Sequence, residues 1–351
     1  MYDFAVVGGG PAGSAAAHRL ATEGASVALI DKPEQGHNRP GEHISGSVAN
    51  ALQTMAVSAI DLEAQIEPSP AIVSHWEYLR VIPYDGADGR TAFNTTRAEL
   101  NALMRKSARR AGAKIIDHVV RAISNDGGWR LSFPQTGDCL TARFLVDATG
   151  RSRSMVPQQE TIRSGDLAAC TVWFEKSDDA PNDKALIIEA FSGGWWSVCG
   201  TPANQTVAVM YFSPRLSRQQ GGNVYDWWER GLEHSPLVRH TLNAAHFSDC
   251  DFRVFPCYPT RSKITCGVNW VAIGDAAVAY DPICGQGVKY SIESGFRAAE
   301  ALLCGSTDSA LNHYNDILID RYDDHLEKRK IVYLDAESVF SPDFLSISIP
   351  N

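Results

Sequence analysis

The stretch Gly8-Gly9-Gly10-Pro11-Ala12-Gly13 decides the fold of the first part of this 351-residue chain. It follows a short apolar segment, Phe4 to Val7, that we expect to be a strand. It opens an alanine-rich segment, from about Pro11 to Thr22, that we expect to be a helix. A strand, a glycine-rich turn and a helix in this order form the phosphate-binding unit of folds that bind a dinucleotide.

Each glycine of this turn has its own task. Gly8 allows the tight turn, Gly10 lets the backbone approach a pyrophosphate, and Gly13 lets the helix pack closely on the strand. The N-terminus of the helix offers unpaired N–H groups and the positive end of its dipole to the phosphates. A second strand, Ser26 to Ile30, leads to Asp31, which is placed to bond a ribose hydroxyl. This acid disfavours the alternative of an ordinary turn, but the motif alone predicts only that some dinucleotide binds.

Two further glycine segments lie far along the chain from the first. Asp147-Ala148-Thr149-Gly150 is a sharp turn after an apolar strand, Phe144 to Val146. Gly274-Asp275 follows the strand Trp270 to Ile273 and runs on to Asp281-Pro282-Ile283-Cys284-Gly285-Gln286-Gly287. Glycines allow close approach of a ligand to the backbone, and the helix that we expect to begin at this last segment points its positive end at such a ligand.

With these three segments, the sequence resembles the flavoprotein monooxygenases built like para-hydroxybenzoate hydroxylase, which include flavin-dependent halogenases and geranylgeranyl reductases. The resemblance covers about residues 1–305 and implies bound FAD. It places the Asp275 carboxylate on the ribityl chain or the pyrophosphate, and it aims the helix after Gly287 at the isoalloxazine ring; simple helix capping is the alternative for the last glycines. The cofactor-binding residues predicted in this way are Gly8, Gly10, Pro11, Ala12, Gly13, Asp31, Lys32, Arg39, Arg97, Asp275, Pro282, Gly285, Gln286 and Gly287.

The composition agrees with a soluble enzyme. The chain is 44% hydrophobic with a formal net charge of −9, so it can bury a full core and offers no basic stripe to nucleic acid. Its eight cysteines are scattered, without zinc-like spacing, so we expect reduced thiols and no metal site. The first strand begins almost at Met1, and no apolar run approaches a membrane span. We therefore expect no signal peptide, no membrane span and a cytoplasmic location.

The predicted fold is mixed α/β, like that of para-hydroxybenzoate hydroxylase. A Rossmann-like FAD-binding domain with a β-meander is joined to a substrate domain built on an antiparallel sheet, and a C-terminal helical segment packs across both. The expected boundaries are 1–68, 97–160 and 265–320 for the discontinuous FAD-binding domain, 69–96 and 161–264 for the substrate domain, and 321–351 for the C-terminal segment.

The substrate sheet is expected to consist of segments rich in β-branched and aromatic residues. Side chains alternate along a strand, so Trp195 and Trp196 should lie on opposite faces and only one can face a pocket. Trp227 and Trp228, on an expected helix, are candidates for an exposed docking surface, although one of them should be core. The expected strands are His75–Ile82, Thr91–Asn94, Cys170–Lys176, Ala185–Phe191, Trp195–Cys199 and Val207–Phe212.

Halogenation is disfavoured by two departures from the halogenase pattern. Arg39-Pro40-Gly41-Glu42 resembles a halogenase-like segment that runs past the flavin edge. Halogenases also carry a Trp-x-Trp-x-Ile-Pro signature and need a lysine downstream of the Pro-Gly-Glu segment to hold or activate hypohalous acid. This chain instead reads Trp195-Trp196-Ser197-Val198-Cys199-Gly200, and it has no lysine between Lys32 and Lys106.

The Pro-Gly-Glu segment, the Gly194-Trp195-Trp196 strand and the compact length are similar to a small subgroup, the flavoproteins that mature tryptophylquinone cofactors in amino-acid oxidases. That resemblance implies a protein substrate, the precursor of a quinone-dependent oxidase, hydroxylated on a tryptophan. Three alternatives stay open: a small-molecule aromatic hydroxylase, a reductase like the geranylgeranyl reductases, and a non-catalytic flavoprotein chaperone. No second Gly-x-Gly-x-x-Gly marks a separate nicotinamide domain. The sequence therefore does not name the electron donor, and transient binding of NAD(P)H and delivery by a reductase both stay open.

Glu42 and His43 are the candidate catalytic residues. The family places their segment beside the flavin, and ring hydroxylation needs a nearby proton donor or acceptor. A solvated glutamate and a structural histidine are the alternatives. The resemblance also implies that Arg39 contacts the flavin or closes the pocket, and that Arg97, at the start of a helix, lies near the cofactor.

Overall fold

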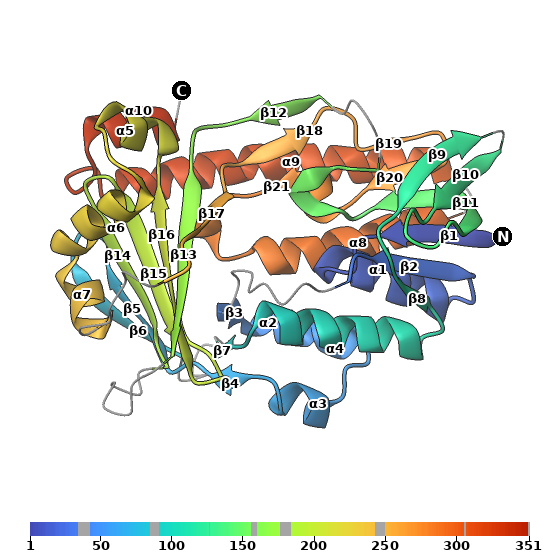
Figure 1. The fold of residues 1–351 in the computed structure, drawn as a ribbon, viewed down its shortest axis with the longest axis horizontal. Coiled ribbons are helices and arrows are strands. Elements are labelled where there is room, and N and C mark those ends of the chain that lie inside the picture. The colour runs from blue at the N-terminus through green and yellow to red at the C-terminus, as the bar shows by residue number, and fades with distance from the viewer. Residues whose placement is uncertain are drawn as a thin grey trace.

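The computed structural model describes residues 1–33, 43–84, 91–125, 127–155, 160–175, 184–242, 250–304 and 307–349. Figure 1 shows two lobes side by side, one built on a mainly parallel sheet and the other on a long antiparallel sheet. The predicted mixed α/β fold is confirmed.

The first lobe contains an eight-stranded sheet. Its strands are β1 (Tyr2–Val7), β2 (Val27–Asp31), β8 (Lys114–Asp117), β9 (Arg121–Asn125), β10 (Gly128–Ser132), β11 (Cys139–Asp147), β19 (Cys266–Gly267) and β20 (Trp270–Ala272). The order is β19-β20-β11-β1-β2-β8, and β1 pairs in parallel with both β2 and β11. β10 and β9 extend β11 as an antiparallel meander. This is the Rossmann-like arrangement that the glycine turn predicts.

Three helices pack together in the first lobe: α1 (Pro11–Thr22), α4 (Arg97–Arg110) and α8 (Gly287–Leu303). Small residues let α1 and α8 come close, since a Cβ on Gly295 would lie only 2.3 Å from the carbonyl oxygen of Ala12. α4 begins at Arg97 because Thr96 and Glu99 form a reciprocal capping box. The lobe also holds α2 (Gly46–Thr54), α3 (Ala59–Glu63) and a small sheet in which β7 (Ala92–Asn94) pairs with β3 (His43–Ser45) and β4 (Glu67–Pro68).

The second lobe contains a seven-stranded sheet. Its strands are β5 (Ala71–His75), β6 (Leu79–Pro83), β13 (Ala168–Glu175), β14 (Leu186–Phe191), β15 (Gly194–Gly200), β16 (Gln205–Phe212) and β17 (Arg253–Pro256). The order is β17-β13-β16-β15-β14-β5-β6, antiparallel except for the β14–β5 pair. The single strand predicted over His75–Ile82 is wrong: the chain turns between β5 and β6. The strand predicted over Thr91–Asn94 forms as β7, but it pairs with β3 and β4 and not with this sheet. Trp76 anchors this turn, because its Nε1 donates to the carbonyl oxygen of Val332.

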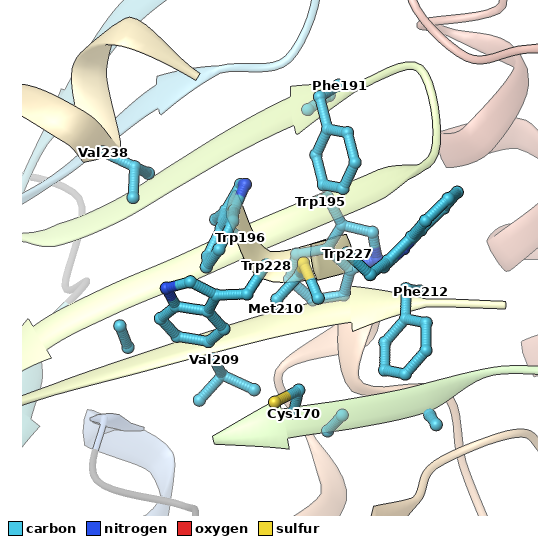
Figure 2. Close-up of a cluster of buried hydrophobic side chains, with 14 of the residues drawn as sticks. Cys170, Phe191, Trp195, Trp196, Val209, Met210, Phe212, Trp227, Trp228 and Val238 are labelled. Atoms are coloured by element: carbon cyan, nitrogen blue, oxygen red, sulfur yellow. The ribbon is translucent and has the colours of Figure 1, made fainter. Parts of the chain in front are cut away.

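The outer face of this sheet is covered by α5 (Pro214–Gln219), α6 (Val224–Glu233) and α7 (Pro236–Leu242) (Figure 1). Trp196 points toward α6 and meets Trp228 edge to face, with ring centroids 4.6 Å apart (Figure 2). Both Trp227 and Trp228 are buried in this core. The suggestion that they form an exposed docking surface is therefore wrong, because the apolar side of α6 faces the sheet.

The C-terminal segment spans both lobes. α9 (Thr307–Leu334) places Tyr314 and Tyr322 in the core of the first lobe and Tyr333 in the core of the second. It passes residue 320, the predicted end of the FAD-binding domain, without a break, and α10 (Pro342–Ser348) follows it. A fourth sheet of β12 (Thr161–Arg163), β18 (Thr260–Ser262) and β21 (Val278–Ala279) completes the described part of the fold. Within the described ranges, no helix has the length and apolar character needed to cross a bilayer.

Candidate functional site

The first glycine turn combines tight packing with open space. Gly8 has φ +110°, and a Cβ there would lie 2.1 Å from the carbonyl oxygen of Ala148. A Cβ on Gly13 would lie 1.9 Å from the carbonyl oxygen of Gly8. A Cβ on Gly10, in contrast, would meet no atom within 4 Å, and Gly10 caps α1 without a side-chain hydrogen bond. The uncapped N–H groups of α1 therefore face space that a phosphate can fill.

Asp31 lies at the end of β2, beside this turn. A Cβ on Gly9 would come within 2.7 Å of its Oδ2 atom, so the carboxylate lies against the glycine backbone. Arg105 of α4 approaches it, with Nη1 3.9 Å from Oδ2, and also pairs with Asp117. Arg105 belongs to a basic stretch of α4, yet its side chain is only 19% exposed. The sequence contains no local signal for this contact, because α4 and β2 meet only in the folded chain.

The second cluster of site residues surrounds Asp275. Gly274 and Asp275 form a 3-10 turn, η2 (Gly274–Ala276), directly after β20. Nε of Arg151 lies 3.6 Å from Asp275 Oδ2, and Arg153 donates to the backbone oxygens of Asp275 and Ala276. These two arginines, which sequence reasoning missed, fix the turn and leave the carboxylate 41% exposed. An exposed carboxylate held in this way can accept hydrogen bonds from a ligand.

The third glycine segment leads into α8. Gly285 adopts φ +59°, and a Cβ added to Gly285 or to Gly287 would meet no atom within 4 Å. Gln286 caps α8 without a side-chain hydrogen bond. The helix begins beside the second lobe's sheet (Figure 1), and Ile283 packs against the core of that sheet. α8 thus presents a second uncapped N-terminus between the lobes.

The three glycine segments meet in the folded chain. A Cβ on Gly274 would lie 2.7 Å from Cβ of Ala12, and α1 packs directly on α8. Two open helix N-termini and two carboxylates are therefore held on one frame, which is the donor and acceptor set that a dinucleotide with a pyrophosphate needs. Among the other predicted residues, Arg97 opens α4, while Arg39 and Glu42 lie outside the described residues.

His43 is the candidate catalytic residue that the structure describes. Its Nδ1 lies 2.9 Å from Oδ1 of Asn94, and Nδ2 of Asn94 donates to the carbonyl oxygen of Lys184. This second bond fixes the amide orientation, so Asn94 accepts from His43 and the Nδ1 atom carries the proton. Nε2 is then a buried lone pair without a hydrogen-bond partner among the described residues. Burial lowers the pKa of His43 and favours the neutral ring.

The inner face of the seven-stranded sheet carries Trp195. Its ring stacks on Tyr211 with centroids 3.8 Å apart, and its Nε1 donates to the hydroxyl of Tyr333. Because Trp196 points to the outer face, the predicted alternation is confirmed. Ile188, Ser197 and Tyr211 share the face of Trp195 and are half-buried. This face offers apolar and neutral polar surface to a flat ring.

All eight cysteines are free. In the part of the chain that the structure describes, no group of three or more His, Cys, Asp or Glu side chains could hold a metal ion.

Comparison with known proteins places this geometry in a family. A family model described as an FAD binding domain matches residues 1–330. A protein named as the FAD-dependent oxidoreductase LodB, from Marinomonas mediterranea, is 22% identical over 345 residues, which cover 94% of this chain and 92% of LodB. The structure of QhpG, a peptidyl tryptophan dihydroxylase essential for tryptophylquinone cofactor biogenesis, has a TM-score of 0.83 at 19% identity and covers 99% of this chain and 78% of QhpG. A variant of halogenase PltM in complex with FAD has a TM-score of 0.73 at 16% identity, covering 97% of this chain and 77% of PltM.

The chain belongs to the FAD-binding family, since the family model covers nearly all of it. It is an FAD-dependent oxidoreductase, and the predicted cofactor, enzyme class and resemblance to tryptophylquinone-maturing and halogenase-like flavoproteins are confirmed. The solved structures share its fold.

Proposed function

We propose that this enzyme hydroxylates a tryptophan side chain of a partner protein, the precursor of a quinone-dependent amino-acid oxidase, during tryptophylquinone biogenesis. The observation that carries the hydroxylation is the buried lone pair of His43 Nε2, which has no hydrogen-bond partner among the described residues. The similarity to LodB and the fold shared with QhpG, which its description names a peptidyl tryptophan dihydroxylase, support the choice of substrate. The FAD contacts that we propose are those of the predicted cofactor-binding residues, with Arg105, Arg151 and Arg153 added.

The position of His43 supports its role as a proton acceptor. β3 carries His43, and Asn94 links it to the backbone just before β14, so the imidazole lies where the first lobe meets the substrate sheet. FAD, when bound and reduced by an external donor, activates O₂ and supplies the oxygen atom. The ring carbon that gains this oxygen must lose its proton to regain aromaticity. His43 Nε2 accepts that proton, because the ring is held neutral and its other nitrogen is already committed to Asn94.

The inner sheet face supports an indole substrate. Ile188, Ser197 and Tyr211 are half-buried there and carry no charge at neutral pH. A mainly apolar surface with a few polar atoms is typical of sites for flat ring systems. A tryptophan presented by a protein would place its indole against this face and leave the peptide outside.

The test is to co-express this chain with an oxidase precursor and measure the mass of the tryptophan-containing peptide. We expect a gain of one oxygen atom per hydroxylation that is lost when Asp275 is replaced by Ala. Turnover of free tryptophan or a small phenol, with no effect on the partner, would favour the small-molecule hydroxylase. Halide incorporation, saturation of an isoprenoid, or partner maturation without O₂ consumption would each overturn the proposal as well.

We predict that His43→Gln lowers the hydroxylation rate constant kcat by about 10²- to 10⁴-fold, the usual contribution of a positioned acid–base group. The FAD content should be unchanged. His75→Gln is the matched control, since His75 pairs with Glu189 on the outer face of the sheet. Equal rates for His43→Gln and wild type would exclude His43 as the proton acceptor.

A further inference from the structure

One side of the C-terminal helix converges on a single residue, Asp281, in the last glycine segment. His325, Arg329 and Tyr333 are spaced four residues apart on α9, so they share one side of the helix. His325 Nε2 accepts from the backbone N–H of Asp281, and the Tyr333 hydroxyl lies 3.4 Å from both Asp281 carboxylate oxygens. Nη1 of Arg329 lies 3.7 Å from Oδ2.

This cluster is fully enclosed. The side chains of Arg329 and Asp281 are 3% and 2% exposed. Arg329 is held from its other side, because Nη2 donates to the carbonyl oxygen of Ser348. A buried charge pair gives little net stability compared with apolar residues of the same shape, because both charges lose their hydration. The need to fill the interior therefore does not by itself explain why Asp281 and Arg329 are buried here as a charge pair.

The cluster connects the two halves of the site. Asp281 accepts from the backbone N–H of Ile283 and so caps the turn η3 (Pro282–Cys284), which leads to Gly285 and Gly287. On the other side, the Tyr333 hydroxyl accepts from Nε1 of Trp195 on the inner sheet face. A continuous chain of hydrogen bonds thus runs from the substrate sheet through α9 to the turn at the start of α8.

We propose that Asp281, Arg329 and Tyr333 are positioning residues, through which α9 fixes the turn at the start of α8 for FAD and ties it to Trp195 of the substrate sheet. The proposal rests on the FAD contact that we propose for this turn and not on the identity of the substrate. None of the three residues needs to touch the reacting atoms. They act by holding the backbone N–H groups of the turn in one place, which an electrostatic contact to a cofactor requires.

Tyr333→Phe tests the link with the least disturbance, since it removes only the hydroxyl. We expect the dissociation constant of FAD to rise about three- to tenfold, the usual effect of one lost hydrogen bond. We also expect a changed visible absorption spectrum of the bound flavin. Tyr322→Phe is the matched control, because Tyr322 lies on the same helix, is equally buried, and its hydroxyl has no hydrogen-bond partner among the described residues.

A double variant separates positioning from stability. Arg329→Met leaves the Asp281 carboxylate buried without its counter-charge, so the urea midpoint of the FAD-saturated protein at pH 7 should fall. Asp281→Asn combined with Arg329→Met removes both charges and should recover much of that midpoint. If the residues position the turn, the FAD dissociation constant and flavin spectrum of the double variant stay altered.

Recovery of FAD affinity and spectrum together with the urea midpoint would overturn the proposal, as would equal behaviour of Tyr333→Phe and Tyr322→Phe. Gly287→Ala separately tests the FAD contact of this turn, on which the positioning proposal rests. Its Cβ meets open space, so it should weaken FAD binding without lowering the urea midpoint. Unchanged FAD binding in Gly287→Ala would remove this turn from the cofactor site itself.

Discussion

The two lobes hold their elements together in opposite ways. In the first lobe, α1 meets β1 and α8 through glycine and alanine, and a Cβ on Gly13 would lie 1.9 Å from a carbonyl oxygen. In the second lobe, large rings fill the space between the sheet and α6, and Trp196 and Trp228 are both fully buried (Figure 2). Close-packed interiors resist changes of either sign. The first lobe should therefore be sensitive to added atoms and the second to removed ones.

The largest effect is expected for Trp196→Ala, which removes the ring at the centre of the second lobe. Large-to-small changes of this kind cost about 3–5 kcal/mol, so the free energy of unfolding should fall by that amount in urea titrations. Tyr78→Ala is the control. Tyr78 is 62% exposed, and its removal should change stability by no more than about 0.5 kcal/mol. Similar losses in both variants would contradict the aromatic core.

A smaller effect with a sharper contrast is expected within the first glycine turn. Gly13→Ala should lower the free energy of unfolding by about 1–3 kcal/mol, since backbone must move to admit the new atom. Gly10→Ala should leave the FAD-free protein within about 0.5 kcal/mol of wild type, because its Cβ meets no atom within 4 Å. It should nevertheless raise the FAD dissociation constant about tenfold or more, by occupying space meant for phosphate. Equal FAD dissociation constants for Gly10→Ala and wild type would show that the open space at Gly10 is not used by the phosphates.

The smallest effect concerns the cluster that joins the lobes, where two groups shift in opposite directions. Burial raises the pKa of Asp281 from 3.8 to about 6, so its contribution to stability is complete below pH 3.8 and is lost as the pH rises through about 6. Burial, with Arg329 nearby, lowers the pKa of His325 from 6.5 to about 4, so its contribution is complete above pH 6.5 and is lost as the pH falls through about 4. The contributions of Asp281 and His325 to the free energy of unfolding therefore change with pH in opposite directions. Arg151, Tyr333, Cys257 and Cys284 also face Asp281. Burial raises the pKa of the tyrosine and of both thiols, so these three groups stay neutral over this range.

We predict that the single variants reveal the separate slopes. Relative to wild type, the stability of Asp281→Asn should rise with pH between about 4 and 6, and that of His325→Gln should fall. Each difference is limited to about 1.4 kcal/mol per pH unit, the value for one proton. Urea unfolding at fixed FAD concentration across this range is the measurement. If the stability of both variants followed the same pH profile, the pKa values of Asp281 and His325 would not shift in opposite directions on folding.

The local features of the site could be predicted from the sequence alone. The glycine turns, the bounds of α1 and the alternation of Trp195 and Trp196 depend on residues that are neighbours along the chain, and their geometry follows from short-range sterics. The family and the FAD cofactor followed from the same motifs. The hairpin at Trp76 escaped prediction because its anchor, Val332, belongs to a helix at the other end of the chain.

Contacts between segments that are distant in the sequence were decided only by the tertiary structure. Asp281 meets His325 and Tyr333 across 44 and 52 residues, and Arg105 reaches Asp31 only because α4 packs on α1 and β8. The position of His43 against Asn94, 51 residues away, also arises from strand pairing. The sequence determined which groups are candidates for binding FAD, because the motif places glycines and acids at fixed local spacing. Packing decided which cations and hydroxyls hold those groups. The local sequence around a charged residue on a helix does not show whether its side chain is buried against a partner or exposed to solvent.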